Sequence, residues 1–266
     1  MLEKLSKGQI SVEEAERLLR ISAIEEVGKM AKIDVFREFR KGIPEIILAE
    51  GKRAEDVAEI ALKMLEKSGR AIISRASKEQ IEIVKRVVAT KDANIRVDEG
   101  AGIVAVRRKG FEAKKTGGKI GILAAGTSDV PVAEEAKVVA EEMGCEVVTA
   151  YDVGVAGIHR LTNPLKEMIK EDVDALIVVA GREGALPSVV AGLIDVPVIA
   201  VPTSVGYGFG GRGLGALMAM LQACSLGVAV VNIDGGVAAG AVAALIANRA
   251  AKFRGRRLKI RLKETL

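Results

Sequence analysis

Short hydrophobic runs recur along the second half of the chain, and a segment with helical spacing follows each of them. The runs cover residues 120–124, 146–151, 175–179, 198–201 and 228–233, and the following segments cover 132–143, 165–169, 186–193, 214–223 and 238–252. Unbroken apolar runs of this length are typical of strands that are buried on both faces. Strict alternation of strand and helix requires parallel pairing with right-handed crossovers. We therefore expect residues 118–252 to form an α/β domain, a flavodoxin-like three-layer sandwich with a parallel sheet.

The first half of the chain has a less regular pattern. Ser11 followed by Glu14 is a capping box that predicts a helix over 12–19, and helical spacing predicts that 24–40 is helical as well. Further along, the pattern predicts strands at 45–49 and 71–74, helices at 53–67 and 78–88, and a hairpin over 95–106. We interpret residues 1–117 as a small α+β domain that ends at a Gly-Gly pair.

Composition and charge narrow the class of protein. Aromatic residues make up only 3% of the chain and Trp is absent, so the core must be aliphatic. Seven bases and no acid lie between residues 252 and 263, and without those seven the formal net charge of +5 becomes −2. A nucleic-acid-binding face needs bases spread over the fold, so we expect no nucleic acid partner. We treat residues 253–266 as a basic C-terminal tail, either solvated or packed on a neighbouring subunit.

Cysteine usage and the first residues indicate the compartment. Cys145 and Cys224 are too few for a secreted disulfide scaffold. The chain begins with a charged, amphipathic segment rather than a signal peptide, and no uncharged apolar run reaches about 18 residues. We expect a cytoplasmic protein without a membrane partner.

Polar residues gather directly after the predicted strands, where α/β folds bind their ligands. Ser128 and Asp129 follow the first strand on a Gly-rich loop that suits an anion or hydroxyls, although Asp129 is also suited to cap the next helix. His159, the one histidine, stands beside Arg160 after the second strand, a pair that suits phosphate or carboxylate unless the histidine is structural. Glu183 lies between glycines after the third strand, where a carboxylate can act as a base.

The loop after the fourth strand imitates a dinucleotide fingerprint. Gly208, Gly210 and Gly213 satisfy G-x-G-x-x-G, and Asp234 follows about twenty residues later. This fingerprint normally opens the first strand–helix unit, whereas here it falls in the fourth. We therefore interpret the match as chance and do not expect a nicotinamide-dependent dehydrogenase.

Several segments in one order resemble a known family. Residues 126–131 (Gly-Thr-Ser-Asp-Val-Pro), the His-Arg pair at 159–160, and 180–191 followed by 196–202 are similar to the PurE family of aminoimidazole ribonucleotide carboxylases and mutases. Three features depart from that family: Glu183 where it carries small residues, the different sequence of 203–208, and the added N-terminal domain. At these same three features the chain resembles the LarB family. Further segments similar to that family are 182–190, Cys224-Ser225, 230–234 and the N-terminal segment 34–52.

The resemblance to LarB implies a reaction on nicotinic acid adenine dinucleotide. Its pyridinium ring is carboxylated at C5 with CO2 or bicarbonate and its phosphoanhydride is hydrolysed. The products are pyridinium-3,5-biscarboxylic acid mononucleotide and AMP, in the first step of nickel-pincer cofactor synthesis. The ring needs a thiolate to make C5 nucleophilic and a base to restore aromaticity, and the resemblance gives these catalytic roles to Cys224 and Glu183. From the residues alone, Cys224 would instead be a small buried cysteine near the negative end of a helix.

The expected site comprises further residues. Those expected to bind substrate are Gly126, Thr127, Ser128, Asp129, His159, Arg160, Thr203, Ser204, Gly206, Tyr207, Asn232 and Asp234. Tyr207 is the expected stacking wall of the ring pocket. Because anhydride hydrolysis often uses Mg²⁺, that ion is a candidate cofactor, with Asp129, Asp152 and Asp234 as available carboxylates. No organic cofactor is expected, since the dinucleotide is a substrate.

Two alternative functions and one expectation about assembly accompany this interpretation. The alternatives are a PurE-type carboxylase or mutase and a non-enzymatic nucleotide-binding scaffold. A homo-oligomer is expected, an octamer by the resemblance, and the Ala/Gly-rich helix over 237–251 permits close packing between subunits.

Overall fold

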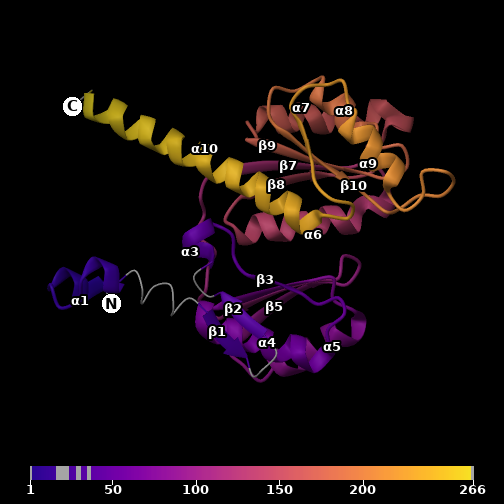
Figure 1. Cartoon of the computed structure of the whole chain (residues 1–266). Helices are drawn as coiled ribbons and strands as arrows, with labels where there is room; N and C mark the ends of the chain where they lie inside the picture. Colours follow the sequence, from indigo (N-terminus) through magenta and orange to yellow (C-terminus); the bar gives the residue numbers. More distant parts are fainter. Residues whose placement is uncertain (1, 16–23, 28–30, 35–36, 265–266) are drawn as a thin grey trace. The chain divides into compact units, whose positions relative to one another are not determined.

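The computed structural model describes residues 2–15, 24–27, 31–34 and 37–264. Two compact units make up the chain (Figure 1). The N-terminal unit comprises Met1–Val97 and Val104–Phe111, and the C-terminal unit comprises Asp98–Ile103 and Glu112–Leu266. The linking residues 112–118 thus group with the second unit. Within the described residues, no helix is both long and apolar enough to cross a membrane.

The N-terminal unit is built on a four-stranded sheet of order β3-β4-β6-β5. Its strands are β3 (Ile46–Leu48), β4 (Arg70–Ser74), β5 (Ala93–Asp98) and β6 (Ile103–Arg108), and its two long helices are α4 (Ala54–Ser68) and α5 (Lys78–Val88). Strand β4 pairs in parallel with β3 and antiparallel with β6. These elements confirm the strands, helices and hairpin predicted between 45 and 106.

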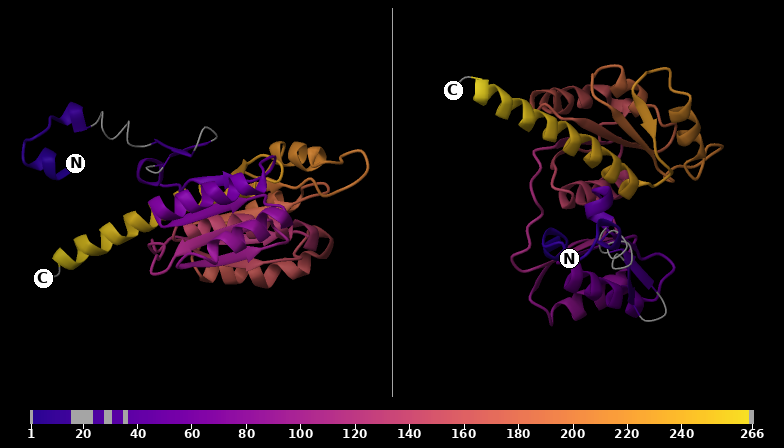
Figure 2. Two further views of the ribbon diagram at one scale, coloured as in Figure 1. Left: turned by 90° about the horizontal axis from the view of Figure 1, so that it is seen from below. Right: turned by 60° about the vertical axis from the view of Figure 1, so that its left-hand side comes forward.

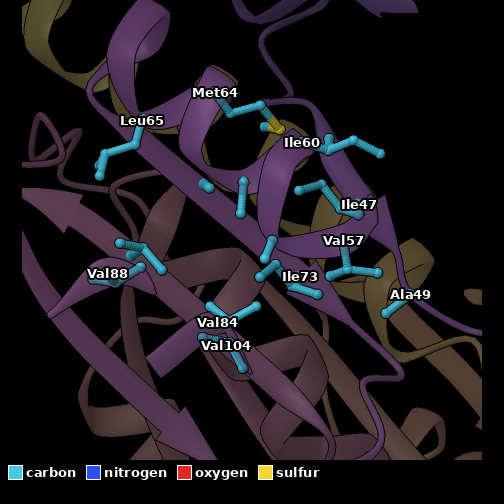
Figure 3. Close-up of a cluster of buried hydrophobic side chains, with 14 of the residues drawn as sticks. Ile47, Ala49, Val57, Ile60, Met64, Leu65, Ile73, Val84, Val88 and Val104 are labelled. Atoms are coloured by element: carbon cyan, nitrogen blue, oxygen red, sulfur yellow. The ribbon is translucent and has the colours of Figure 1, made fainter. Parts of the chain in front are cut away.

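Helices α4 and α5 bury their apolar faces against this sheet. Val57, Ile60 and Met64 recur at helical spacing on α4 and pack with Ile73 of β4 and Val104 of β6 (Figure 3). The spacing that predicted the helix is therefore also the spacing that fills the core.

The prediction of a helix over 24–40 was wrong. That region holds the antiparallel pair β1 (Ile24–Val27) and β2 (Ala31–Asp34), followed by the short helix α3 (Arg37–Lys41). Apolar and charged residues alternate in β2, whereas β1 reads Ile-Glu-Glu-Val, and over stretches this short both patterns also satisfy helical spacing. Ile33 of β2 is buried in the core of the unit, and this tertiary contact favours the strand.

The first residues are described only in part. Helix α1 covers Leu2–Ser6, and residues 12–15 are helical with the Glu14 backbone N–H donating to Ser11 Oγ at 3.1 Å. The rest of the helix predicted over 12–19 lies outside the described residues.

The C-terminal unit has the predicted parallel sheet. Its strands are β7 (Lys119–Ala124), β8 (Glu146–Ala150), β9 (Ala175–Ala180), β10 (Val198–Pro202) and β11 (Val228–Val230). All neighbours pair in parallel, in the order β11-β10-β9-β7-β8, which is the flavodoxin-like order. The predicted three-layer α/β class is therefore confirmed.

Helices cover both faces of this sheet (Figure 1). One face carries α7 (Thr162–Lys170), α8 (Leu186–Ala191) and α9 (Leu214–Leu221), and the other carries α6 (Val130–Glu142) and α10 (Gly236–Glu264). The short turns η1 (Thr127–Asp129) and η2 (Val155–Leu161) precede α6 and α7. Helices α6 and α10 approach closely because Gly240 has no side chain. A Cβ atom there would lie 2.5 Å from the Ala136 carbonyl oxygen.

Helix α10 is longer than predicted. It continues from the Ala/Gly-rich segment through the basic segment that we set apart as a tail, and it extends past the sheet (Figure 2). Arg254 forms an ion pair with Asp174 and donates to the Gly117 carbonyl oxygen at 3.0 Å. These contacts hold the helix where it leaves the sheet.

Candidate active site

Several charged side chains lie at the carboxyl edge of the sheet of the C-terminal unit, where the parallel strands end. Strand β7 lies between β8 and β9, so the strand order reverses at β7: β8 is added on one side of it and β9 to β11 on the other. This fold binds its ligands at such a switch point. A cavity of about 400 Å³ opens there, lined by residues of the loops after β7, β8 and β9. Its charged lining residues are Asp129, Asp152, Arg160, Arg182 and Glu183.

Asp129 forms the floor of this cavity. Its side chain does not cap α6; one oxygen accepts from the Gly126 backbone N–H at 2.9 Å and the other from Thr203 Oγ1 at 2.6 Å. Asp129 is 5% exposed and Thr203 is fully buried. A Cβ atom at Gly181 would lie 2.6 Å from Thr203 Oγ1, so only glycine fits beside this pair. The loops after β7, β9 and β10 are thereby tied together.

Arg160 enters the cavity from the loop after β8. It forms an ion pair with Asp152, which also lines the cavity. Gly157 leaves room for the guanidinium, because a Cβ atom there would lie 2.5 Å from Arg160 Nε. The pair fixes the orientation of Arg160 and partly neutralises its charge. His159, its neighbour, is exposed and does not line the cavity.

A second cavity of about 430 Å³ lies beside the first and shares two residues with it. Arg182 and Glu183 line both, and the second is completed by Tyr207, Gly208, Gly210, Gly215 and Ala219. The Arg182 guanidinium carbon lies 4.3 Å from the centre of the Tyr207 ring. The Arg182 backbone N–H donates to the Val205 carbonyl oxygen at 3.3 Å, which joins the two loops. Glu183 is exposed, so its carboxylate is open to a ligand.

The structure gathers some of the predicted site residues and leaves others apart. Gly126, Asp129, Arg160, Glu183 and Tyr207 line the cavities. Thr203 supports Asp129, Gly206 packs beside the Arg182 backbone, and Asp234 accepts from the Ser204 backbone N–H at 2.8 Å. Thr127, Ser128, His159 and Asn232 are exposed and line neither cavity. Thr203 bonds to Asp129 and Ser204 to Asp234, so the start of the loop after β10 is held by the loops after β7 and β11.

Cys224 lies away from these cavities. It is exposed, in the loop between α9 and β11, and this loop reaches the amino edge of the sheet, where the strands begin. The neighbouring Ser225 Oγ donates to the Ser188 carbonyl oxygen at 2.7 Å and lies 3.1 Å from Ser188 Oγ. Cys224 lines neither cavity, whereas Glu183 lines both. The two residues expected to catalyse the reaction are therefore not brought together within one chain.

Arg182 was not among the residues expected to bind substrate, and Asp152 was expected only as an available carboxylate for Mg²⁺. Both stand in loops directly after strands, β9 and β8, which is the signal that could have found them. Both also have positive φ angles, of 53° and 57°, a conformation that often marks functional loops.

The three carboxylates named for Mg²⁺ each have partners within the chain. Asp129 accepts two hydrogen bonds, Asp152 pairs with Arg160, and Asp234 accepts from Ser204. Among the residues that the structure describes, no three His, Cys, Asp or Glu side chains lie close enough to hold one.

The flavodoxin-like sheet order and the cavities at its switch point define a doubly wound α/β protein, and comparison with known proteins narrows the class. The AIR carboxylase family profile matches residues 119–265, and a profile described as LarB/PurE-like N-terminal domain matches residues 24–108. The chain therefore belongs to the AIR carboxylase family. The second match identifies it with the LarB family, which is related to PurE, and its function is of the carboxylase/mutase type.

Individual relatives agree with this assignment. An uncharacterised protein of Methanocaldococcus jannaschii is 46% identical over 248 residues, which are 93% of this chain and 95% of that protein. The N5-carboxyaminoimidazole ribonucleotide mutase of the same organism is 37% identical over 117 residues, 43% of this chain and 69% of that enzyme. The mutase of Thermotoga maritima is 32% identical over 133 residues, 48% of this chain and 74% of that enzyme.

Proposed function

We propose that the protein carboxylates nicotinic acid adenine dinucleotide at C5 of its pyridinium ring and hydrolyses its phosphoanhydride to release AMP. The observation that carries this proposal is the place of Glu183, an exposed carboxylate where two cavities of similar size meet. A base at that junction suits a two-part substrate whose ring lies on one side and whose second nucleotide lies on the other.

The chemistry assigns one step to each of two side chains. A Cys224 thiolate adds to C4 of the pyridinium ring, which cancels the positive charge and makes C5 the nucleophilic carbon of an enamine. C5 then attacks CO2 and becomes tetrahedral, carrying both its proton and the new carboxylate. Glu183 removes that proton, the C5–C6 double bond re-forms, and expulsion of the thiolate from C4 restores the pyridinium ring. Water cleaves the phosphoanhydride, giving AMP and the dicarboxylated mononucleotide.

Substrate binding is the role proposed for the remaining cavity residues. Arg160 offers a guanidinium, already oriented by Asp152, to a phosphate or carboxylate group. The Gly126–Asp129 loop lies directly before α6, where a phosphate is favoured by the helix dipole. Tyr207 offers its exposed ring as a stacking wall.

The separation of Cys224 from Glu183 leads us to propose that the site is completed by a second copy of the chain. Both side chains are exposed, and they belong to loops at opposite edges of the sheet. Around Cys224, the side chains of Met218, Leu221 and Leu226 are each more than half exposed, a patch that suits a subunit interface. The resemblance implies eight copies, and light scattering at micromolar concentration tests this. A monomer would contradict the proposal.

Product analysis tests the proposed reaction against its competitors. The purified protein is incubated with nicotinic acid adenine dinucleotide and ¹³C-bicarbonate, and product masses are measured. AMP together with a mononucleotide that carries one ¹³C carboxylate is the expected result. Turnover of N5-carboxyaminoimidazole ribonucleotide instead would establish a PurE-type mutase. Tight binding of the dinucleotide with no product from either substrate would indicate a binding scaffold.

A further inference from the structure

Arg182 occupies the junction between the two cavities of the site. Together with Glu183 it lines both, and each cavity is within the usual range of small-molecule sites, at about 400 and 430 Å³. A ligand that fills both cavities must therefore pass this arginine.

The charge of Arg182 is available to such a ligand. Its guanidinium stacks on the Tyr207 ring at 4.3 Å, and in the part of the chain that the structure describes no carboxylate forms an ion pair with it. Arg160, the other arginine of the first cavity, already pairs with Asp152. When a two-part ligand spans this junction, its bridging group therefore faces the Arg182 guanidinium, whose charge is not compensated by a carboxylate.

The backbone holds Arg182 in this place. Its φ angle of 53° lies in the left-handed region, which is costly for a residue with a Cβ atom and persists where the surroundings impose it. Two neighbours impose it here: the Val205 carbonyl oxygen accepts from the Arg182 N–H at 3.3 Å, and Gly184 is packed so closely that a Cβ atom there would lie 2.7 Å from the Ala216 carbonyl oxygen. The guanidinium is therefore presented by a fixed loop.

We infer that Arg182 binds the diphosphate bridge of a dinucleotide whose two halves occupy the two cavities, and that it selects dinucleotides over mononucleotides. The inference rests on the proposed function for the identity of the dinucleotide. Arginine suits this role because its planar fork donates two parallel hydrogen bonds to phosphate oxygens. Tyr207 keeps the fork in place through a cation–π contact with its ring. Arg182 is thus a binding and specificity residue, distinct from the catalytic Glu183.

Binding measurements with two probes test this inference. NAD⁺ carries the diphosphate bridge and AMP carries a single phosphate, and their dissociation constants are measured by calorimetry for wild type and variants. Arg182→Ala should weaken NAD⁺ binding about 10- to 100-fold, the usual loss of a charge-assisted contact, and AMP binding by about threefold or less. Arg182→Lys should recover only part of the loss, because lysine keeps the charge but not the fork.

Matched variants separate this role from general effects of charge and folding. Arg212→Ala removes an exposed arginine of the same Gly-rich loop that also has a positive φ angle and lines neither cavity, so NAD⁺ binding should not change. Arg182→Gly accepts the positive φ angle without strain and should lose NAD⁺ affinity as Arg182→Ala does. Tyr207→Leu removes the ring that supports the guanidinium and should lose about two- to fivefold in NAD⁺ affinity.

Three results would overturn the inference: unchanged NAD⁺ affinity in Arg182→Ala, an equal loss for NAD⁺ and AMP, or an equal loss in Arg212→Ala. Its failure is distinguishable from failure of the proposed function. If wild type makes no carboxylated product but Arg182→Ala still selectively loses NAD⁺, the inference stands and the reaction is wrong. If wild type carboxylates and Arg182→Ala binds NAD⁺ normally, the inference alone is wrong.

Discussion

The two cysteines stand in equivalent places in the chain and in different surroundings. Cys145 directly precedes β8 and Cys224 precedes β11, so both lie toward the amino edge of the sheet, on its two outer strands. Cys145 is buried and Cys224 is exposed. Burial raises the pKa of the Cys145 thiol from 9.0 to about 11, which keeps it protonated at neutral pH. A position before a strand therefore does not decide whether a thiol can react. Its burial by the surrounding residues decides it.

The neighbours of each cysteine match these surroundings. Cys145 Sγ donates to Asn248 Oδ1 at 3.2 Å, and Asn248 also donates to the Met143 carbonyl oxygen at 3.0 Å, which fastens α10 to the end of α6. Cys224 has no such contact among the described residues, and its loop is anchored by Ser225 on Ser188. The first thiol belongs to the packing of the unit and the second faces outward.

The largest effect expected is the loss of carboxylation in Cys224→Ser. Serine is nearly isosteric but its hydroxyl is far less ionised than a thiol, so turnover should fall about 1,000-fold or more while the protein still folds. The matched variant Cys145→Ser should keep activity within about threefold. Rates of product formation by both variants measure the difference, and equal activity of Cys224→Ser and wild type would end the covalent mechanism.

A mixing experiment sharpens the comparison by asking which copy supplies Cys224. Glu183→Gln should by itself lower turnover about 100-fold or more. If the thiol and the carboxylate come from two copies, co-assembly of equal amounts of Cys224→Ser and Glu183→Gln chains should leave about a quarter of the sites with both native residues. Activity near that fraction of wild type is expected in co-purified mixed oligomers. Activity no higher than that of the separate variants would show that both residues act from one chain.

Arg160→Lys should have a smaller effect, mainly on binding. Lysine keeps the charge facing Asp152 but cannot hold an oxyanion with two parallel bonds, so KM should rise about tenfold with a smaller change in kcat. Steady-state kinetics measure the split. A collapse of kcat at unchanged KM would mean that Arg160 acts in the chemical step.

The smallest effect expected concerns the stability of the buried thiol. Because the folded state raises the pKa of Cys145, the folded protein resists its ionisation and the unfolded chain does not. The resulting stabilisation is present below pH 9 and is lost as the pH rises from 9.0 to about 11. Cys145→Ser should cost about 1 kcal/mol near neutral pH and remove this component of the pH dependence. Urea unfolding of both proteins between pH 8 and about 10.5 checks it, and an unchanged pH profile in the variant would contradict it.

The contrast also shows how far the sequence predicts this molecule. The C-terminal unit was predictable because its strands are buried on both faces and alternate with helices, which leaves few topologies. The region 24–40 was not, because its segments are too short for their pattern to separate helix from strand, and contacts such as that of Ile33 decide between them.

The candidate site was predictable as a set of loops but not as a set of side chains. Position after a strand indicated both Arg160 and His159, yet only the arginine lines the cavity, since the turn of η2 directs neighbouring side chains apart. Arg182 shares the position after a strand, but its place in the site depends on contact with Tyr207 and on cavities formed by distant segments. Cys224 was expected in the site by resemblance, and its exposed place in the loop before β11, at the amino edge of the sheet, was found only in the structure.

The central claim is that Cys224 attacks the pyridinium ring. The most direct test is to incubate wild type, Cys224→Ser and Cys145→Ser with NAD⁺ in the absence of CO2, quench, digest and map the peptides by mass. An adduct on the Cys224 peptide in wild type and Cys145→Ser, and none in Cys224→Ser, is the predicted result. An adduct on Cys145, or carboxylation by a wild-type enzyme that never forms an adduct on Cys224, would contradict the account.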